Sequence, residues 1–250
     1  MRISSKSLAL GLFFAVGALA QNSIPPGTII PAQFNHSLNS QKSKTGQTIT
    51  ARIMQDVPLS AGKKIRAGAK VIGYVASVSA PDREGRSRIR LRFDRIQLGH
   101  KPVPIRASLR ALASMMEVEE AQIPPSGPDR GTPWAWTTRN LIGGEVAYGE
   151  GGPVARGTRI VGMALANGVL APVKSTPSGC RGEIADNTQP QALWVFSSDA
   201  CGVYGMPGVE ITHAGRTEPL GEIVLTSKRG KLEISSGSGM LLRVNGENTP

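Results

Sequence analysis

Apolar and polar residues alternate with a period of two over several short stretches of the chain. This alternation is typical of β-strands that are buried on one face. It is clearest in residues 48–53, 88–93 and 103–110, and in the second of these every polar position is an arginine. Strand-length apolar runs bounded by Gly, Ser or Pro follow at 193–196, 223–225, 232–234 and 240–244. Gly99 and His100 separate two of the alternating runs and predict a hairpin turn.

Helical periodicity is scarce, and residues 109–120 are the only stretch that predicts a helix. The chain also contains 30 glycines, 18 prolines and few aromatic residues, a composition that favours short strands joined by tight turns. We therefore predict an all-β fold, either a barrel or two related β units joined by a Pro/Gly-rich linker.

An internal echo favours related units. Residues 62–73 (GKKIRAGAKVIG) align without a gap on residues 151–162 (GGPVARGTRIVG), at an offset of 89 positions. All three glycines match, and the two residues before the last glycine are apolar in both segments. The pattern predicts a turn glycine, a short strand, and a glycine where the strand bends or another backbone comes close.

Composition along the chain predicts five ranges. Residues 1–20 form a signal peptide, and residues 21–47 an extended segment rich in Pro, Ser, Asn and Lys. A first β unit spans 48–112, a linker or mobile excursion 113–145, and a second β unit with a disulfide loop 146–250. Four prolines within residues 123–133 exclude a central strand there.

The predicted signal peptide decides the compartment. Arg2 and Lys6 precede a short apolar core, and residues 18–20 (ALA) form a cleavage site. The apolar run is shorter than the ~20 residues that span a bilayer, and no later run is long enough. Cleavage would lower the net charge from +11 to +9 by removing two basic residues. We predict a periplasmic or secreted protein that is attracted to anionic envelope polymers or lipid surfaces.

Cys180 and Cys201 are the only cysteines. In an oxidising compartment we expect a disulfide between them. A loop of about 22 residues closed in this way stabilises the fold by about 3 kcal/mol on the chain-entropy account.

The one concentrated charge feature is a row of arginines at a period of two. Arg86, Arg88, Arg90 and Arg92 fall on one face of a predicted strand, and Arg106 and Arg110 on what we expect to be the neighbouring strand. One interpretation is a solvated outer face that discourages edge pairing. The other is an anion-binding face, because guanidinium groups bind phosphate and carboxylate in pairs.

The sequence carries no recognised catalytic or metal-binding pattern. The three histidines are far apart and lack metal-ligand spacing, and the chain has neither a phosphate-binding loop nor a dinucleotide fingerprint. We therefore predict no catalytic residues, no metal site and no cofactor.

Several short motifs between residues 26 and 107 resemble the periplasmic β-barrel domain of TrbI-type conjugation and type IV secretion proteins. They are residues 26–32 (PGTIIPA), Asn39 with Ser40, Gly46, residues 51–53 (ARI), Asp56 with Val57, residues 68–74 (GAKVIGY), residues 85–88 (GRSR) and residues 93–96 (FDRI). This resemblance covers about a third of the chain, and the whole chain also resembles uncharacterised exported bacterial proteins. The TrbI-type resemblance implies a barrel fold, a non-enzymatic envelope scaffold and envelope protein partners.

Taken together, the sequence favours an exported non-enzymatic scaffold or binding protein of the cell envelope with a basic β face. The alternative is a secreted hydrolase acting on cell-wall or extracellular polymer. Two converging carboxylates in a cleft, ~5–10 Å apart, would favour the hydrolase. A barrel filled by side chains would favour the scaffold.

Overall fold

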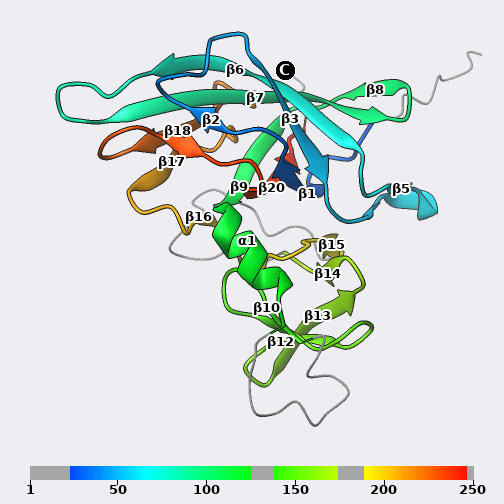
Figure 1. Ribbon diagram of the computed structural model, residues 1–250. Helices are drawn as coiled ribbons and strands as arrows, with labels where there is room; N and C mark the ends of the chain where they lie inside the picture. The colour runs from blue at the N-terminus through cyan, green and yellow to red at the C-terminus, as the bar shows by residue number, and fades with distance from the viewer. Residues whose placement is uncertain (1–22, 125–137, 174–188, 247–250) are drawn as a thin grey trace, which may run out of the picture.

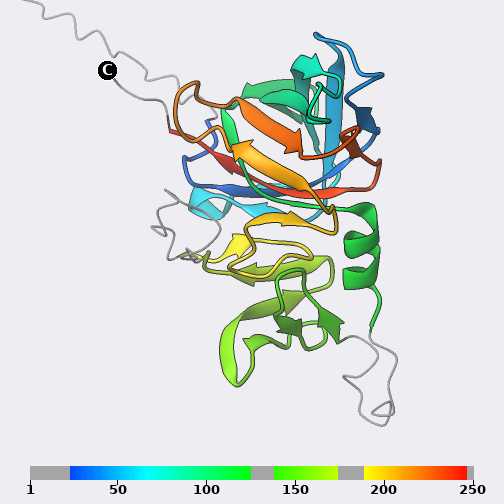
Figure 2. The same cartoon turned by 90° about the vertical axis from the view of Figure 1, so that its left-hand side faces the viewer.

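The computed structural model describes residues 23–124, 138–173 and 189–246. Within these ranges nearly every regular element is a β-strand, and α1 (Met115–Gln122) is the one α-helix. The prediction of an all-β fold is confirmed. Figures 1 and 2 show a large, strongly curled sheet above a smaller sheet, with α1 running along one side of the join.

The large sheet has ten strands. In spatial order nine of them run β16, β9, β20, β1, β3, β6, β7, β18, β17, and β8 pairs with β7 off this path. Their bounds are β1 Ile29–Phe34, β3 Thr48–Ile53, β6 Lys70–Ser79, β7 Ser87–Leu98, β8 Lys101–Pro104, β9 Ala107–Ala113, β16 Gly202–Tyr204, β17 Val209–His213, β18 Ile223–Ser227 and β20 Gly239–Val244. The two terminal strands, β16 and β17, meet across the curl, so the sheet is a nearly closed barrel.

The small sheet has six strands in chain order, from β10 to β15. They are β10 Arg139–Asn140, β11 Val146–Ala147, β12 Pro153–Arg156, β13 Arg159–Leu165, β14 Gly168–Ala171 and β15 Gln191–Ala192. Two short pairs complete the fold, β2 (Leu38–Asn39) with β19 (Glu233–Ile234) and β4 (Val57–Pro58) with β5 (Lys64–Ile65), together with a 3-10 turn at Ser60–Gly62.

Two apolar cores follow from this arrangement. The first fills the inside of the large sheet with side chains such as Ile53, Leu91, Phe93 and Leu242. The second lies between the outer side of β1, β9 and β20 and the small sheet, and it includes Phe196. The three central strands are therefore buried on both faces.

Burial on both faces explains why the range 21–47, predicted as an extended segment, contains a central strand. Five of the six residues of β1 are buried, so the strand does not alternate between apolar and polar residues. A strand covered on both sides has a continuous apolar run in place of a period of two. β1 pairs with β20 on one side and with β3 on the other.

The predicted hairpin at Gly99 and His100 is confirmed, because Leu98 pairs with Lys101 across a two-residue loop. The stretch 103–110 does not form one strand, however. It is divided between β8, which pairs with β7, and β9, which pairs with β20 and β16. The chain leaves one neighbour for another at Ile105 and Arg106, which interrupts the strand.

The predicted helix also begins later than expected. Residues 109–113 belong to β9, and α1 begins only after Ser114. The Ser114 hydroxyl accepts a hydrogen bond from the backbone N–H of Glu117, which satisfies one of the free donors at the helix start. Residues 109–113 pair in the large sheet, so the spacing of their apolar side chains does not indicate a helix.

The two halves of the internal echo lie in different sheets. Gly73 in β6 and Gly162 in β13 both stand where another backbone comes close. A methyl group would lie 2.0 Å from the Arg92 carbonyl oxygen at Gly73, and 2.3 Å from the Leu170 carbonyl oxygen at Gly162. The preceding strands differ, because β12 forms a hairpin with β13 whereas β5 pairs with β4.

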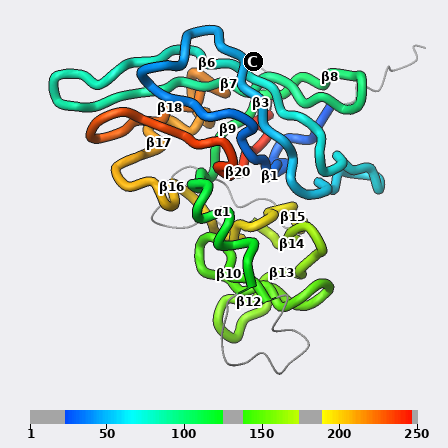
Figure 3. Tube along the Cα trace, in the orientation of Figure 1, coloured from blue at the N-terminus to red at the C-terminus, as the bar shows by residue number. Residues whose placement is uncertain are grey.

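The chain visits the large sheet twice. Residues 29–113 supply β1, β3 and β6 to β9, the following segment forms the small sheet, and residues 202–244 return to supply β16, β17, β18 and β20. Figure 3 shows the blue start and the red end of the trace together in the upper part of the molecule. The range predicted as a linker, 113–145, includes α1 and β10, while residues 1–22 and 125–137 lie outside the described residues.

None of the helices in the described ranges has the length and hydropathy required to cross a bilayer.

Candidate functional site: the barrel seam and the arginine face

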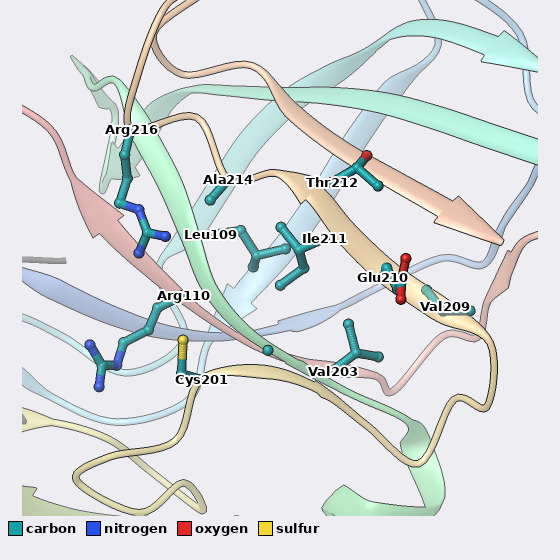
Figure 4. Close-up of a pocket in the computed structure, with 11 residues that line it drawn as sticks. Leu109, Arg110, Cys201, Val203, Val209, Glu210, Ile211, Thr212, Ala214 and Arg216 are labelled. Atoms are coloured by element: carbon teal, nitrogen blue, oxygen red, sulfur yellow. The ribbon is translucent and has the colours of Figure 1, made fainter. Parts of the chain in front are cut away.

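The two terminal strands of the large sheet leave an opening in the barrel wall, which we call the seam pocket. β16 and β17 are joined by residues 205–208 and diverge from that turn (Figure 4). At the far end the backbone N–H of Leu109 donates a 2.8 Å hydrogen bond to the Ala214 carbonyl and closes the wall again. The opening between them has a volume of about 470 Å³.

The pocket has an apolar floor and a polar rim. Its floor is formed by Leu109, Val203, Val209 and Ile211. Leu109 belongs to the first core, and the other three pack against that core while remaining partly exposed. The rim carries Glu210, Thr212 and Arg216, whereas Arg110, which also lines the pocket, is almost completely buried. Figure 4 shows both guanidinium groups toward the end where β16 and β17 are farthest apart.

A bulge accounts for the divergence of β17. Its pairing with β18 shifts register between Ile211 and His213, so Thr212 is an extra residue on β17. A bulge increases the local twist and bends the strand that carries it. β17 therefore turns away from β16 and leaves the barrel open at this point.

Acidic and polar groups on the rim have partners within the described residues. Glu210 Oε1 lies 2.5 Å from Lys228 Nζ, which forms an ion pair on the outer surface. Thr212 Oγ1 lies 3.0 Å from Thr226 Oγ1 and 3.2 Å from the Val224 carbonyl oxygen. The carboxylate on this rim is thus already neutralised by Lys228.

A second bulge places Arg110. The register of β9 against β20 shifts between Leu241 and Leu242, which makes Arg110 the extra residue on β9. Its side chain is only 2% exposed, and its Nη2 donates to the Ser198 carbonyl at 3.5 Å. The bulge thus directs a guanidinium out of the barrel, toward the join with the small sheet.

The expectation that Arg106 and Arg110 lie on the strand next to the arginine row is wrong. The neighbours of β7 are β6, β8 and β18, whereas Arg110 lies on β9, and Arg106 lies between β8 and β9. Arg106 is exposed and Arg110 is buried. The six arginines therefore do not form one surface.

The arginine row itself follows the predicted alternation. Arg88, Arg90 and Arg92 point away from the core on β7, with Ile89 and Leu91 buried between them. Arg90 Nη1 and Arg92 Nη2 lie 3.3 and 3.4 Å from the two carboxylate oxygens of Glu222. We call this surface of β7 the arginine face.

Arg86 lies in the turn before β7 and pairs with Asp82 and Glu84, at 3.4 and 2.8 Å. Both partners in each of these pairs are substantially exposed. Each pair therefore contributes only ~0–1 kcal/mol to the stability of the fold. Three of the four arginines, Arg86, Arg90 and Arg92, are therefore paired with carboxylates. The sequence pattern did not predict these ion pairs.

A polar network, buried at Glu145 and partly exposed at Arg156 and Asp199, connects residues 197–199 to the small sheet. Glu145 is 1% exposed and accepts hydrogen bonds from the Ser198 N–H at 2.8 Å and the Ser198 hydroxyl at 2.6 Å. Arg156 Nε lies 3.6 Å from Glu145, and Arg156 Nη2 pairs with Asp199. The Ser197 hydroxyl donates to Asp199 at 2.9 Å. Two carboxylates thus converge here on one guanidinium.

Tyr204 lies beside this network on β16. Its hydroxyl oxygen accepts a 2.9 Å hydrogen bond from the Cys201 backbone N–H. Burial raises the pKa of the Tyr204 phenol above its ordinary value, and the nearby Asp199 carboxylate adds to the rise. The phenol stays neutral and holds the chain at the start of β16.

Cys201 also lines the seam pocket, while Cys180 lies outside the described residues, so the disulfide stays a prediction. Within the ranges that the structure describes, no three His, Cys, Asp or Glu side chains gather in a group that could hold a metal ion. The sequence could not point to the seam pocket, because β9 is separated by about 90 positions along the chain from β16 and β17, which form the rest of the pocket.

Comparison with known proteins assigns no family to this chain. No protein family matches the chain, and no curated protein matches it. Solved structures that are similar to it include ComB10 of the Com Type IV secretion system of Helicobacter pylori, with 28% identity over 32% of this chain. The similarity covers 40% of that ComB10 chain, with a TM-score of 0.25. The chain thus spans less than half the length of that ComB10 chain.

Proposed function

We propose that this protein is an exported, non-enzymatic scaffold or binding protein of the cell envelope. The observation that carries the proposal is the filled interior of the large sheet. Ile53, Leu91, Phe93 and other apolar side chains of the first core occupy the barrel. A barrel of this kind presents its surface to partners, whereas a ligand-holding barrel keeps an open interior.

The polar network that connects residues 197–199 to the small sheet also supports binding over hydrolysis. Glu145 and Asp199 are the converging carboxylates that a hydrolase would need, yet both bind Arg156 and serine hydroxyls. Glu145 is almost completely buried, so a polymer chain has no access to it. Carboxylates held in this way attach residues 197–199 to the small sheet.

Localisation outside the cytoplasm is part of the proposal and is supported by the signal pattern of residues 1–20. Envelope proteins are the first class of partner that we propose. An anionic polymer or lipid surface is the second, supported by the net charge of +11 and by the exposed side of the arginine face.

A polymer assay separates the scaffold from the hydrolase. Purified mature chain is incubated with isolated cell wall and with extracellular polysaccharide, and released soluble fragments are measured alongside sedimentation of the protein. We expect no fragments above the level of a heat-denatured sample. Release that grows with time and enzyme concentration, and that falls in Glu145→Gln, would establish the hydrolase instead.

The arginine face is tested with two double variants. Replacing Arg88 and Arg90 by Gln leaves Arg92 to neutralise Glu222, so the fold is retained. The control replaces Lys42 and Lys44, which lie outside the arginine face. Binding to vesicles of anionic lipid is measured at two salt concentrations, since exposed charges are screened over ~8–10 Å at 0.1–0.15 M. A larger loss in the arginine variant supports a binding face, and equal losses leave only general basicity.

A further inference from the structure

We propose that a cluster of cations at one end of the large sheet binds phosphate groups. The cluster, which we call the basic corner, consists of Arg52, Lys64, Arg66 and Lys70. The inference rests on the proposed function as a binding protein with anionic partners, and it names a site outside the arginine face and the chemistry of its ligand. Three features carry it: two cations that face each other, a single carboxylate among the four, and a turn that does not require these side chains.

The basic corner is formed by β3, β5 and the turn that leads from β5 into β6. The Gly68 N–H donates a 2.8 Å hydrogen bond to the Ile53 carbonyl, and the Ile53 N–H donates one of 2.8 Å to the Ala69 carbonyl. The turn is therefore fixed to the end of β3. Figure 1 shows β5 beyond the end of the large sheet at which β6 begins. All four cationic side chains are exposed at this end.

Arg52 and Lys70 lie directly opposite each other in the register of β3 and β6. Both point to the outer side of the large sheet, and the Cβ atoms of residues placed in this way are about 4.5–5.5 Å apart. Neither side chain forms an ion pair within the ranges that the structure describes. Like charges directly opposite each other destabilise a pair of strands. An anion bound between the two side chains removes that repulsion.

Asp56 is the carboxylate of the basic corner. Its Oδ2 lies 2.5 Å from Lys64 Nζ and 4.0 Å from Arg66 Nη1. Its Oδ1 accepts a 2.8 Å hydrogen bond from the Ala67 N–H. The hydrogen bond from Lys64 and that from the Ala67 N–H lower the pKa of the Asp56 carboxyl below its ordinary value. The carboxylate stays ionised at neutral pH, yet it offsets the charge of only one of the four cations.

The internal echo shows that the turn does not depend on these charges. Pro153 and Ala155 stand in the second half of the echo at the positions of Lys64 and Arg66. The third cation of the first half has a basic counterpart, and all three glycines are shared. The glycine pattern is therefore compatible with uncharged residues at two of these positions. The concentration of charge is a property of the first half alone, and it is available for binding.

Charge and hydrogen-bonding capacity select phosphate as the ligand. A phosphate monoester carries about 1.5–2 negative charges at neutral pH and three acceptor oxygens. A guanidinium binds two such oxygens with paired hydrogen bonds, and an ammonium adds a compact point charge. One phosphate group can thus contact Arg52 and Lys70 together and offset both charges, whereas one carboxylate offsets a single charge. Lipid headgroups and soluble polyphosphates both present this chemistry, and the experiment separates these two sources.

The experiment compares two double variants of the purified mature chain. One replaces Arg52 and Lys70 with Gln. The control replaces Arg83 and Lys44 with Gln, which removes the same two kinds of charge at exposed positions outside the basic corner. Arg83 lies in the loop at the far end of β6, and Lys44 precedes the opposite end of β3.

Two measurements are made on the parent and on both variants. Sedimentation with phosphatidylcholine vesicles that contain phosphatidic acid measures binding to lipid headgroups. The rise of the thermal midpoint in tripolyphosphate measures binding of soluble phosphate, because a ligand that binds the folded state stabilises it. Citrate at matched ionic strength is the carboxylate control.

We expect the corner variant to lose about 25-fold in vesicle affinity, at about fivefold for each cation near an anionic surface, and the control variant to lose much less. Tripolyphosphate should raise the thermal midpoint of the parent and the control but not that of the corner variant, and citrate should have a smaller effect. A response to vesicles alone identifies lipid headgroups as the source of the phosphate, and a response to tripolyphosphate alone identifies a soluble source.

The inference is overturned if the parent responds to neither source, if the two double variants lose binding equally, or if citrate acts as strongly as tripolyphosphate. The corner variant should fold, because it removes two like charges that face each other. If its thermal midpoint shows that it does not, the single variants Arg52→Gln and Lys70→Gln decide by the same measurements.

Failure here is distinguishable from failure of the proposed function. A protein that ignores both phosphate sources but crosslinks to envelope proteins through another surface keeps its role as a scaffold and loses only this site. A protein that releases fragments from cell-wall polymer loses the proposed function, whatever the phosphate measurements show.

Discussion

The side chain of Gln55 binds the backbone of Trp194 across the join between the two sheets. Gln55 Oε1 accepts a 2.7 Å hydrogen bond from the Trp194 N–H, and Gln55 Nε2 donates at 2.9 Å to the Val169 carbonyl. Gln55 is 2% exposed and follows β3 of the large sheet, whereas its two partners belong to the small-sheet side. One amide thus satisfies a buried donor and a buried acceptor of the other sheet.

Replacing Gln55 with Leu should destabilise the protein by about 2–6 kcal/mol. The reason is that two buried backbone groups lose their partners, at about 1–3 kcal/mol for each group. Chemical denaturation measures the effect. Gln97→Leu is the matched control, because the Gln97 amide bonds only to the Gly99 carbonyl in an exposed hairpin. Equal effects of the two variants would mean that Gln55 does not hold the sheets together.

The close-approach glycines give a second prediction. Gly73→Ala and Gly162→Ala should each cost about 1–3 kcal/mol or more, because the added methyl group would overlap the neighbouring strand. Gly157→Asn is the control, since Gly157 has φ +59, a value that Asn tolerates, and nothing lies within 4 Å of an added Cβ. Thermal denaturation of the three variants decides. Near-parental midpoints for both alanine variants would contradict the role assigned to the echoed glycines.

A third prediction concerns alkaline pH. The pKa of the Tyr204 phenol is raised in the folded protein above its ordinary value of 10.0, chiefly by burial. The stability that this neutral phenol contributes is complete below about pH 10 and is lost as the pH rises through the raised folded-state pKa. Tyr204→Phe should therefore show a shallower fall in the free energy of unfolding between pH 9 and pH 11.

The same variant should be less stable than the parent at pH 8, by about 1 kcal/mol, because the Cys201 N–H loses its acceptor. Tyr148→Phe serves as the control for removal of a tyrosine hydroxyl, since Tyr148 is 39% exposed. Identical slopes for the parent and Tyr204→Phe would show that another group governs the alkaline transition.

The cysteines provide a fourth prediction. Mature protein purified without reductant should show no titratable thiol in denaturant. Reduction should lower the thermal midpoint, in keeping with ~3 kcal/mol for a loop of about 22 residues. Two reactive thiols in native material would contradict a bond between Cys180 and Cys201.

The sequence predicts best those strands that are buried on one face. β3 and β7 alternate as their residues predict, with the first core on one side and exposed polar residues on the other. The hairpin at Gly99 was equally readable, because the required turn is encoded in two adjacent residues. Local sequence patterns were thus sufficient to predict elements that depend only on neighbouring residues.

What the sequence did not predict depends on contacts between distant segments. β1 and β9 are buried on both faces because the small sheet covers their outer faces, a fact that no local window contains. Glu222 neutralises Arg90 and Arg92 from about 130 positions away. The seam pocket exists only because residues 202–213 return to the large sheet and diverge there, so neither its shape nor its lining is visible in any motif.

Crosslinking in intact cells tests the central claim most directly. The mature chain is crosslinked within the envelope, purified under denaturing conditions, and its crosslinked peptides are identified by mass spectrometry. A scaffold or binding protein should yield reproducible crosslinks between its large sheet and one or more defined envelope proteins, in amounts comparable to the chain itself. Recovery of the chain without any envelope partner, or of the chain only in the cytoplasm with its first twenty residues intact, would contradict the account.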